Sequence, residues 1–148
     1  MPTYVISLAR NLVNDAQKSA IAEAISRIHN ESTGAPSYFV QVVFEEKEPS
    51  NRFLGGSLEE KHVWVRGDIR AGRTEAQRTA LILSIMRQVS RITTVKEENV
   101  WVYLNNLAPG DMLEYGHVLP QPGQEAEWFD NLPESLQAYL KGLGTSRK

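Results

Sequence analysis

The sequence predicts an α/β domain built from two consecutive β-α-β units, which form a four-stranded sheet with two helices on one face. Three observations predict this fold: an internal repeat, a strand–helix–strand pattern in each copy, and a helix-capping signal at the same place in both copies. With 148 residues, 41% of them apolar, the chain is long enough for one domain with a hydrophobic core, and we expect that domain to span residues 1–148.

The repeat organises the first hundred residues. Shifting the sequence by 60 residues aligns segment 2–46 with segment 62–106 without a gap, and ten residue pairs are then identical, among them Val5 with Val65. Most of the other pairs share apolar or polar character. We therefore expect two structurally similar units, followed by a C-terminal extension over residues 107–148.

Each copy contains the pattern of a strand, a helix and a second strand. The expected strands are short runs rich in β-branched and aromatic residues, namely TYVISLA (3–9), YFVQVVF (38–44), HVWVRGD (62–68) and NVWVYLN (99–105). Asn14 with Gln17, and Thr74 with Gln77, match the two positions of a capping box at a helix start. Two strands joined by a helix of this length indicate a right-handed parallel crossover in each unit.

Apolar residues at helical spacing mark the inner face of each helix. These residues are Ile21, Ile25 and Ile28 in the first copy and Leu81, Ile85 and Val89 in the second. The other face of the sheet has no segment left to cover it, because the rest of the chain is short. A large face with valine and aromatic residues is usually buried, so we expect self-association.

Proline and glycine punctuate the extension, which we expect to be loop-like after residue 105. A short helix is predicted over PESLQAYLKGL (133–143), with Pro133 in its first turn and Gly142 or Gly144 at its end.

Composition excludes several classes of protein. The chain has no cysteine, and its histidines (His29, His62 and His117) lack the spacing of metal ligands, so we expect no metal. A net charge of −2 argues against a nucleic-acid partner. No run of 18 apolar residues and no secretory signal is present, so we expect no membrane partner and a cytoplasmic location.

The second residue is a candidate functional group. Methionine aminopeptidase removes an initiator methionine that precedes a small residue such as Pro2. The processed chain would begin with a free secondary amine, and an ordinary α-amino group has a pKa of about 7.7–8.0. Pro2 could therefore hold or release a proton near neutral pH.

A second candidate site is the RAGRT segment before the second helix. Arg70 and Arg73 precede the Thr74 cap, and a helix start together with arginine favours an anion such as a carboxylate. The first copy has Arg10 but lacks the second arginine, while the repeat places His62 opposite Pro2. In a parallel sheet the strand starts can lie close together while the arginines lie at a strand end. Folding or a neighbouring subunit would have to bring them to Pro2, and the sequence leaves this open.

These residues together resemble the tautomerase superfamily, and more narrowly its cis-3-chloroacrylic acid dehalogenase group. The resemblance covers nearly the whole chain. It is carried by Pro2, His29, FLGG (53–56), RAGR (70–73), WVY (101–103) and the long stretch EYGHVLPQPGQEAEWFDNL (114–132).

The resemblance implies a role for each matched position. Pro2 would be a protonated general acid toward the substrate α-carbon, and Glu114 would activate water with the help of Tyr103. Arg70 and Arg73 would bind the substrate carboxylate, with His29 also at the carboxylate end. Leu119 would line the pocket. The group uses no cofactor and forms homotrimers, so a small carboxylate substrate and a homotrimer are expected.

Such a set is chemically sensible without the family name. Two guanidinium groups can stabilise the enediolate-like state that forms when water adds to an unsaturated acid. A carboxylate base and an ammonium acid can move the two protons. Nearby cations would lower the pKa of Pro2, whereas a nearby Glu114 would raise it.

Two pocket positions depart from the pattern of the group. Ala35 stands where a hydroxyl residue is usual, and Phe39 stands where leucine is usual. The expected activity is cofactor-independent hydration of small α,β-unsaturated carboxylates, including hydrolytic dehalogenation of cis-3-haloacrylates. The alternatives are a keto–enol tautomerase with unprotonated Pro2 as base, and a non-enzymatic binding protein of this fold.

Overall fold

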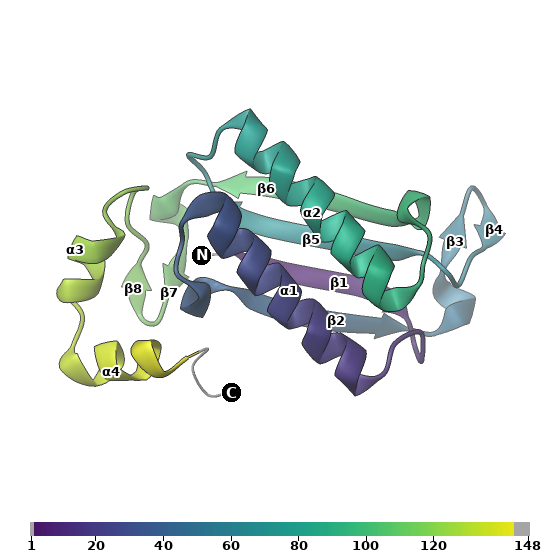
Figure 1. The fold of residues 1–148 in the computed structure, drawn as a ribbon, viewed down its shortest axis with the longest axis horizontal. Coiled ribbons are helices and arrows are strands. Elements are labelled where there is room, and N and C mark those ends of the chain that lie inside the picture. The colour runs from purple at the N-terminus through teal and green to yellow at the C-terminus, as the bar shows by residue number, and fades with distance from the viewer. Residues whose placement is uncertain (1, 144–148) are drawn as a thin grey trace.

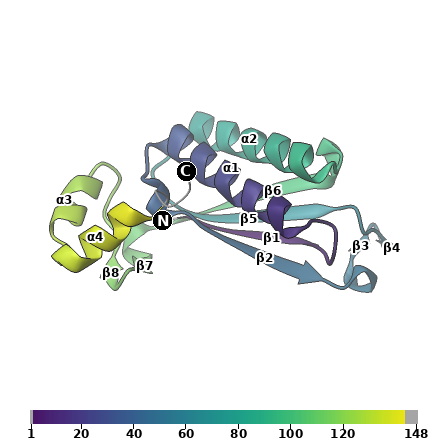
Figure 2. The ribbon, with the colours of Figure 1, turned by 60° about the horizontal axis from the view of Figure 1, so that its bottom comes forward.

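In the computed structural model, which describes residues 2–143, a four-stranded sheet carries two long helices on one face (Figure 1). The strands are β1 (Thr3–Ala9), β2 (Gln41–Lys47), β5 (Val63–Arg70) and β6 (Val100–Leu107), in the order β2-β1-β5-β6. The helices are α1 (Asp15–Thr33) and α2 (Glu75–Thr93). Figure 2 shows both helices on the same side of the sheet, so the predicted fold class is confirmed.

The two central strands run antiparallel. β1 pairs with β2 and β5 pairs with β6 in parallel, as each β-α-β unit requires, but β1 and β5 are antiparallel with Thr3 opposite Asp68. The start of β1 therefore lies beside the end of β5. The folding of one chain is enough to bring Pro2 to the arginine segment, which the sequence had left open.

Both helices begin where the capping signals predict. The Asn14 side chain accepts a hydrogen bond from the Gln17 backbone N–H at 2.8 Å, and the Gln17 side chain accepts one from the Asn14 N–H at 2.9 Å. Thr74 and Gln77 form the same reciprocal pair before α2. The predicted strand over 38–44 begins later, at Gln41, because residues 37–39 form a 3₁₀ turn.

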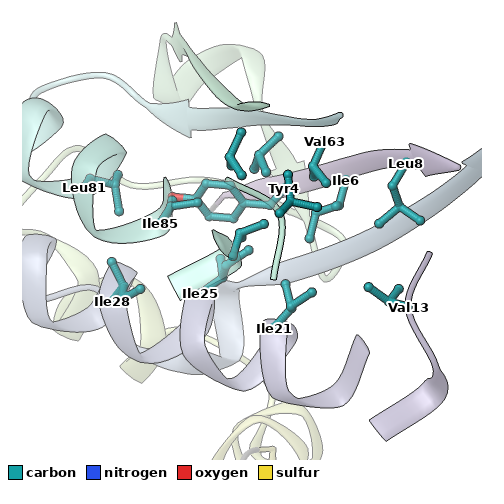
Figure 3. Close-up of a cluster of buried hydrophobic side chains, with 14 of the residues drawn as sticks. Tyr4, Ile6, Leu8, Val13, Ile21, Ile25, Ile28, Val63, Leu81 and Ile85 are labelled. Atoms are coloured by element: carbon teal, nitrogen blue, oxygen red, sulfur yellow. The ribbon is translucent and has the colours of Figure 1, made fainter. Parts of the chain in front are cut away.

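The hydrophobic core lies between the sheet and the helices (Figure 3). The side chains of Tyr4, Ile6 and Leu8 on β1 point into it and are fully buried. The predicted inner faces of both helices are confirmed, since these residues are all buried: Ile21, Ile25, Ile28, Leu81, Ile85 and Val89.

The ungapped alignment of the two copies is wrong over their first strands. Val65 is fully buried in the core, whereas Val5 is only partly buried because it alternates with the inward-pointing Tyr4 and Ile6. Side chains alternate between the faces of a strand, so the first strands are equivalent only after a shift of one residue. Pro2 therefore has no structural counterpart in His62.

The offset of 60 residues holds elsewhere and continues past residue 106. The hairpin β3 (Phe53–Leu54) and β4 (Ser57–Leu58) recurs as β7 (Leu113–Glu114) and β8 (His117–Val118). The two hairpins lie at opposite ends of the sheet (Figure 1). The segment after residue 105 is thus more ordered than the prediction of a loop, because β6 and a hairpin extend into it.

Two short helices follow the second hairpin. The first, α3 (Glu125–Asp130), was not predicted. The second, α4 (Glu134–Gly142), confirms the predicted helix, but Pro133 is the residue before its first turn rather than within it. Gly142 is the last helical residue, and Gly144 lies outside the described residues. In both views these helices lie at the β7–β8 end of the sheet (Figure 2).

The face of the sheet opposite the helices, here called the open face, carries exposed aromatic residues. Trp101 is 40% exposed and Tyr103 is 52% exposed. Of the helices within residues 2–143, none is long and apolar enough to cross a membrane.

Candidate active site

Pro2 lies buried at the start of β1, where its carbonyl accepts a hydrogen bond from the Gln41 N–H at 3.0 Å. The β1–β5 register pairs Thr3 with Asp68. Continuing this register by one residue places Pro2 beside Ile69 and next to Arg70. Whether Met1 is removed remains a prediction, because that residue lies outside the described part of the chain.

Arg70 is the last residue of β5, and its cationic side chain is fully buried. Residues that are distant in the sequence hold this side chain in place. It is 1% exposed; one terminal nitrogen (Nη1) donates to the Pro120 carbonyl at 2.6 Å, and the other (Nη2) forms an ion pair with Glu125. The remaining donor, Nε, is also buried and has no partner within residues 2–143. A buried N–H without an acceptor is rare in folded proteins, so Arg70 has a donor available for a ligand.

Arg73 lies in the loop that follows, three residues from Arg70 and one before the Thr74 cap. Burial lowers the pKa of Arg73, as does the charge of Arg70, while Glu125 acts in the opposite direction. Gly72 has a φ of +111°, and a β-carbon there would lie 2.6 Å from Pro122 Cγ. Glycine therefore allows the C-terminal segment to pack directly over the arginine loop.

His29 faces the same charges from α1. It is 1% exposed, and its Nδ1 lies 2.8 Å from the Tyr4 hydroxyl. Burial lowers the pKa of His29 to about 3, with Arg73 and Arg70 acting in the same direction. The other ring nitrogen, Nε2, is buried and has no partner within the described chain.

The polar groups at the end of β5, in the following loop and on α1 can therefore bind an anion. Arg70 and Arg73 supply positive charge, and His29 Nε2 and Arg70 Nε are buried nitrogens without partners among residues 2–143. In the same range, no three His, Asp or Glu side chains gather closely enough to hold a metal ion. A carboxylate, with two acceptor oxygens, fits the geometry of arginine.

Glu114, Phe39 and Leu119 come from segments outside the four-stranded sheet and its two long helices. Phe39 and Leu119 are buried in one small apolar cluster, against Trp128 among others. Phe39 and the partly buried Glu114 line a cavity of about 1370 Å³, which also reaches Thr3, the residue after Pro2. This cavity is larger than a small substrate needs.

Tyr103, another predicted site residue, lies on the opposite side of the sheet from His29 within one chain. It lies on the open face, where its ring packs against Trp64 at 5.7 Å between centroids, whereas His29 lies on the helix-covered side. Along β6 it is four residues before Leu107, which pairs with Arg70. At about 3.3 Å per residue, this is about 13 Å along the strand.

Glu125 is a site residue that the sequence did not predict. It follows Arg70 by 55 residues and belongs to the short helix α3 that no pattern indicated. Desolvation alone would raise the pKa of Glu125, but the hydrogen bond and charge of Arg70 together with backbone hydrogen bonds lower it below its ordinary value. An acidic residue in the first turn of a helix is common, so no local signal could have identified this ion pair.

Comparison with known proteins agrees with this fold and site. A family model described as "Putative oxalocrotonate tautomerase enzyme" matches residues 1–131. A crystal structure of a member of the cis-3-chloroacrylic acid dehalogenase family is 39% identical, covers 95% of this chain and 99% of its own, and superposes with a TM-score of 0.93. Among curated proteins there is no significant match.

Two more distant structures share the central fold. Pt0534, inactivated by 2-oxo-3-pentynoate, is 26% identical with a TM-score of 0.74, and the match covers 79% of this chain and 94% of that one. A fused 4-OT described as an asymmetric trimer is 25% identical with a TM-score of 0.72, and the match covers 78% and 94% of the two chains.

A sheet of paired β-α-β units with a proline at the start of its first strand defines the class, that of the tautomerases. The chain belongs to the family that the model describes as putative oxalocrotonate tautomerase enzymes, and its similarity to the 39% identical structure places it in the cis-3-chloroacrylic acid dehalogenase group of the superfamily. The resemblance found in the sequence is thus confirmed, and the family is one of enzymes.

Proposed function

We propose that the protein adds water to small α,β-unsaturated carboxylates without a cofactor, and that it hydrolytically dehalogenates cis-3-haloacrylates. One observation carries the proposal: His29 and Arg70 each have a buried nitrogen without a partner in the described chain, the charges of Arg70 and Arg73 act on His29, and the β1–β5 register places Pro2 next to Arg70. Such a site favours an anion next to an amine. The similarity to a dehalogenase-family structure over nearly the whole chain supports the same reaction class.

The substrate carboxylate binds to Arg70 Nε, Arg73 and His29 Nε2 in this proposal. The two cations draw electron density from the double bond and stabilise the enediolate-like state as it develops. Because Glu125 already neutralises part of the Arg70 charge, Arg73 supplies the less compensated cation. Phe39 and Leu119 exclude water from the apolar side of the substrate.

The chemical step moves two protons and requires no redox partner. Glu114 accepts a proton from water as the water oxygen bonds to the β-carbon, and protonated Pro2 delivers a proton to the α-carbon. With a cis-3-chloroacrylate substrate, the resulting carbon bears both hydroxyl and chlorine. It then loses chloride and the hydroxyl proton, which leaves an aldehyde, malonate semialdehyde.

Tyr103 takes part in this scheme only through a second copy of the chain. The candidate site of the same chain lies on the other side of the sheet, while the Tyr103 ring is half exposed on the open face. A structure with 25% identity is described as a trimer, and we include a homotrimer in the proposal. In that assembly Tyr103 of one copy assists Glu114 of the next.

The position of Tyr103 favours the alternative that the protein is a keto–enol tautomerase. Keto–enol tautomerisation needs neither Glu114 nor Tyr103, and the residues it does need, Pro2 and the arginines, are brought together by a single chain. In that reaction unprotonated Pro2 moves a proton between carbons. The two activities differ in whether water enters the product.

The experiment starts from processed protein whose amino terminus has been checked by mass spectrometry. It is incubated separately with cis- and trans-3-chloroacrylate, an acetylenic acid and an enol pyruvate, and each reaction is followed by NMR. Hydrated product from cis-3-chloroacrylate or the acetylenic acid supports the proposal. Ketonisation alone supports the tautomerase, and binding without turnover of any substrate supports a non-enzymatic role.

The Glu114→Gln variant separates the two enzymatic reactions. Loss of the base should lower water addition about 100-fold and leave ketonisation of the enol pyruvate nearly unchanged. An equal loss of both activities would contradict the role given to Glu114.

A further inference from the structure

The Tyr4 side chain lies in the hydrophobic core, and its hydroxyl contacts one polar group, the His29 ring. Its side chain is fully buried among aliphatic residues of the sheet and helices (Figure 3). Gly67 lies directly opposite on β5, and a β-carbon at Gly67 would lie 2.6 Å from the Tyr4 ring. The missing side chain of Gly67 therefore makes the space that holds this ring.

The Tyr4 hydroxyl is the hydrogen-bond partner of one ring nitrogen of His29, so it bears on which nitrogen of the ring carries hydrogen. The hydroxyl lies 2.8 Å from His29 Nδ1 and has no other partner among residues 2–143. If Nδ1–H donated to the hydroxyl, the Tyr4 proton would be left buried without an acceptor, at a cost of about 1–3 kcal/mol. If instead the hydroxyl donates to Nδ1, the hydroxyl and Nδ1 are both satisfied, and the ring hydrogen lies on Nε2, which has no partner among residues 2–143 and is left to donate to a ligand.

Packing alone does not explain a histidine at this position. The corresponding residue of α2, 60 positions later, is Val89, and both residues are 1% exposed in the core. Valine thus fills this place in one helix without a polar group. The first copy instead buries a hydrogen-bonded pair, and a satisfied buried polar pair fixes one arrangement of its groups.

We propose that Tyr4 is a positioning residue that holds His29 as a neutral donor, with its Nε2–H directed at the substrate carboxylate. This inference rests on the proposed carboxylate site and adds the group that orients one of its donors. Burial strongly raises the pKa of Tyr4, so the hydroxyl keeps its proton and remains a donor. His29 consequently contributes a hydrogen bond to the anion rather than a third positive charge.

The tautomer can be read directly in the native protein by ¹⁵N NMR correlation of the imidazole rings. We expect a bare Nδ1 and a protonated Nε2 in His29 at neutral pH. His62 is an internal reference, because its Nδ1 lies 3.3 Å from an Arg52 nitrogen that can only donate. A His29 ring protonated on Nδ1 would overturn the proposal, whatever the protein catalyses.

Two variants test the positioning from different sides. Tyr4→Phe removes the hydroxyl, while Gly67→Ala keeps it and pushes the ring away. Both should weaken binding of the unreactive carboxylate 3-chloropropionate about five- to tenfold, and kcat/KM for cis-3-chloroacrylate should fall by a similar factor, mainly through KM. Tyr139→Phe, on the exposed surface of α4, is the matched control and should behave as wild type.

The readouts also separate a positioning role from a structural one. A purely structural role would lower the midpoint of urea unfolding and leave 3-chloropropionate affinity in the folded variants unchanged, which would overturn the proposal. If the native enzyme does not convert cis-3-chloroacrylate at all, the proposed function fails. The His29 tautomer and the binding of 3-chloropropionate would still decide the role of Tyr4.

Discussion

The two ends of the sheet are built from the same repeat, yet only one of them gathers a candidate active site. At the Pro2 end, Arg70 and His29 are buried, and the partly buried Arg73 acts electrostatically on His29. At the opposite end, the Arg10 side chain is 58% exposed and pairs with Glu48.

The opposite end also has nitrogens without partners in the described chain, on Arg52, His62 and Trp64. These three residues are only partly buried, however, and Arg52 already donates to Ser7 and to the His62 carbonyl. Up to residue 143, the C-terminal segment does not cover that end (Figure 1). A duplicated fold therefore supplies two similar ends of the sheet. One end becomes a candidate site because the C-terminal segment covers it and because it carries residues that the other copy lacks.

The largest expected effect comes from the amine. Pro2→Ala should lower kcat/KM for cis-3-chloroacrylate by about 10²–10⁴-fold, because general acid catalysis contributes that much. His62→Ala, at the opposite end, should change it less than about twofold. An equal loss of kcat/KM in the Pro2→Ala and His62→Ala variants would contradict the assignment of the active site to the Pro2 end of the sheet.

The second-largest effect on kcat/KM is expected from removing the positive charge of Arg73. Arg73→Gln should lower kcat/KM about 100-fold, the amount typical of one stabilising donor in an active site. Arg10→Gln removes an exposed cation that is paired with Glu48 and should have little effect. Steady-state kinetics on both variants checks this, and a strong effect of Arg10→Gln would argue against a single site.

The sequence predicted the elements that local signals encode. Asn14 and Thr74 placed both helix starts, and the strand TYVISLA matches β1. It did not predict the antiparallel pairing of β1 with β5, since strand direction across the repeat depends on how the two units dock. The shift of one residue between the first strands was likewise visible only from the alternation of burial at Val5 and Val65.

The candidate site was predictable to the extent that the family pattern marks it. The β1–β5 register places Pro2 next to Arg70, and the charges of Arg70 and Arg73 act on His29. Composition and spacing alone could not have joined residues so distant in sequence. The ion pair of Arg70 with Glu125 depends on tertiary packing of a short helix, so the sequence had no local sign of it.

This ion pair predicts a smaller effect, on stability. Glu125→Gln leaves Arg70 buried without its counter-charge and should lower the free energy of unfolding by about 2 kcal/mol. Glu127→Gln, on the exposed side of the same helix, is the control. Urea unfolding measures both, and equal stabilities would show that Pro120 and solvent are sufficient partners for Arg70.

Acid should destabilise the Pro2 end through His29. The folded-state pKa of about 3 lies below the unfolded value of about 6.5, so the unfolded state binds more protons between these values. Stability from His29 is therefore complete above about pH 6.5 and is lost as the pH falls toward 3. Relative to a His29→Gln variant, wild type should lose about 2 kcal/mol between pH 6.5 and 4.5. If the free energies of unfolding of wild type and His29→Gln, measured with urea, changed equally with pH, His29 would not titrate in this way.

The most direct measurement is a crystal structure of the processed protein with 3-chloropropionate bound. The account predicts a free Pro2 nitrogen facing the ligand, with the carboxylate within about 3 Å of Arg70 Nε, Arg73 and His29 Nε2. A ligand bound instead near Arg52 and His62, or a Pro2 nitrogen that still carries Met1, would contradict it.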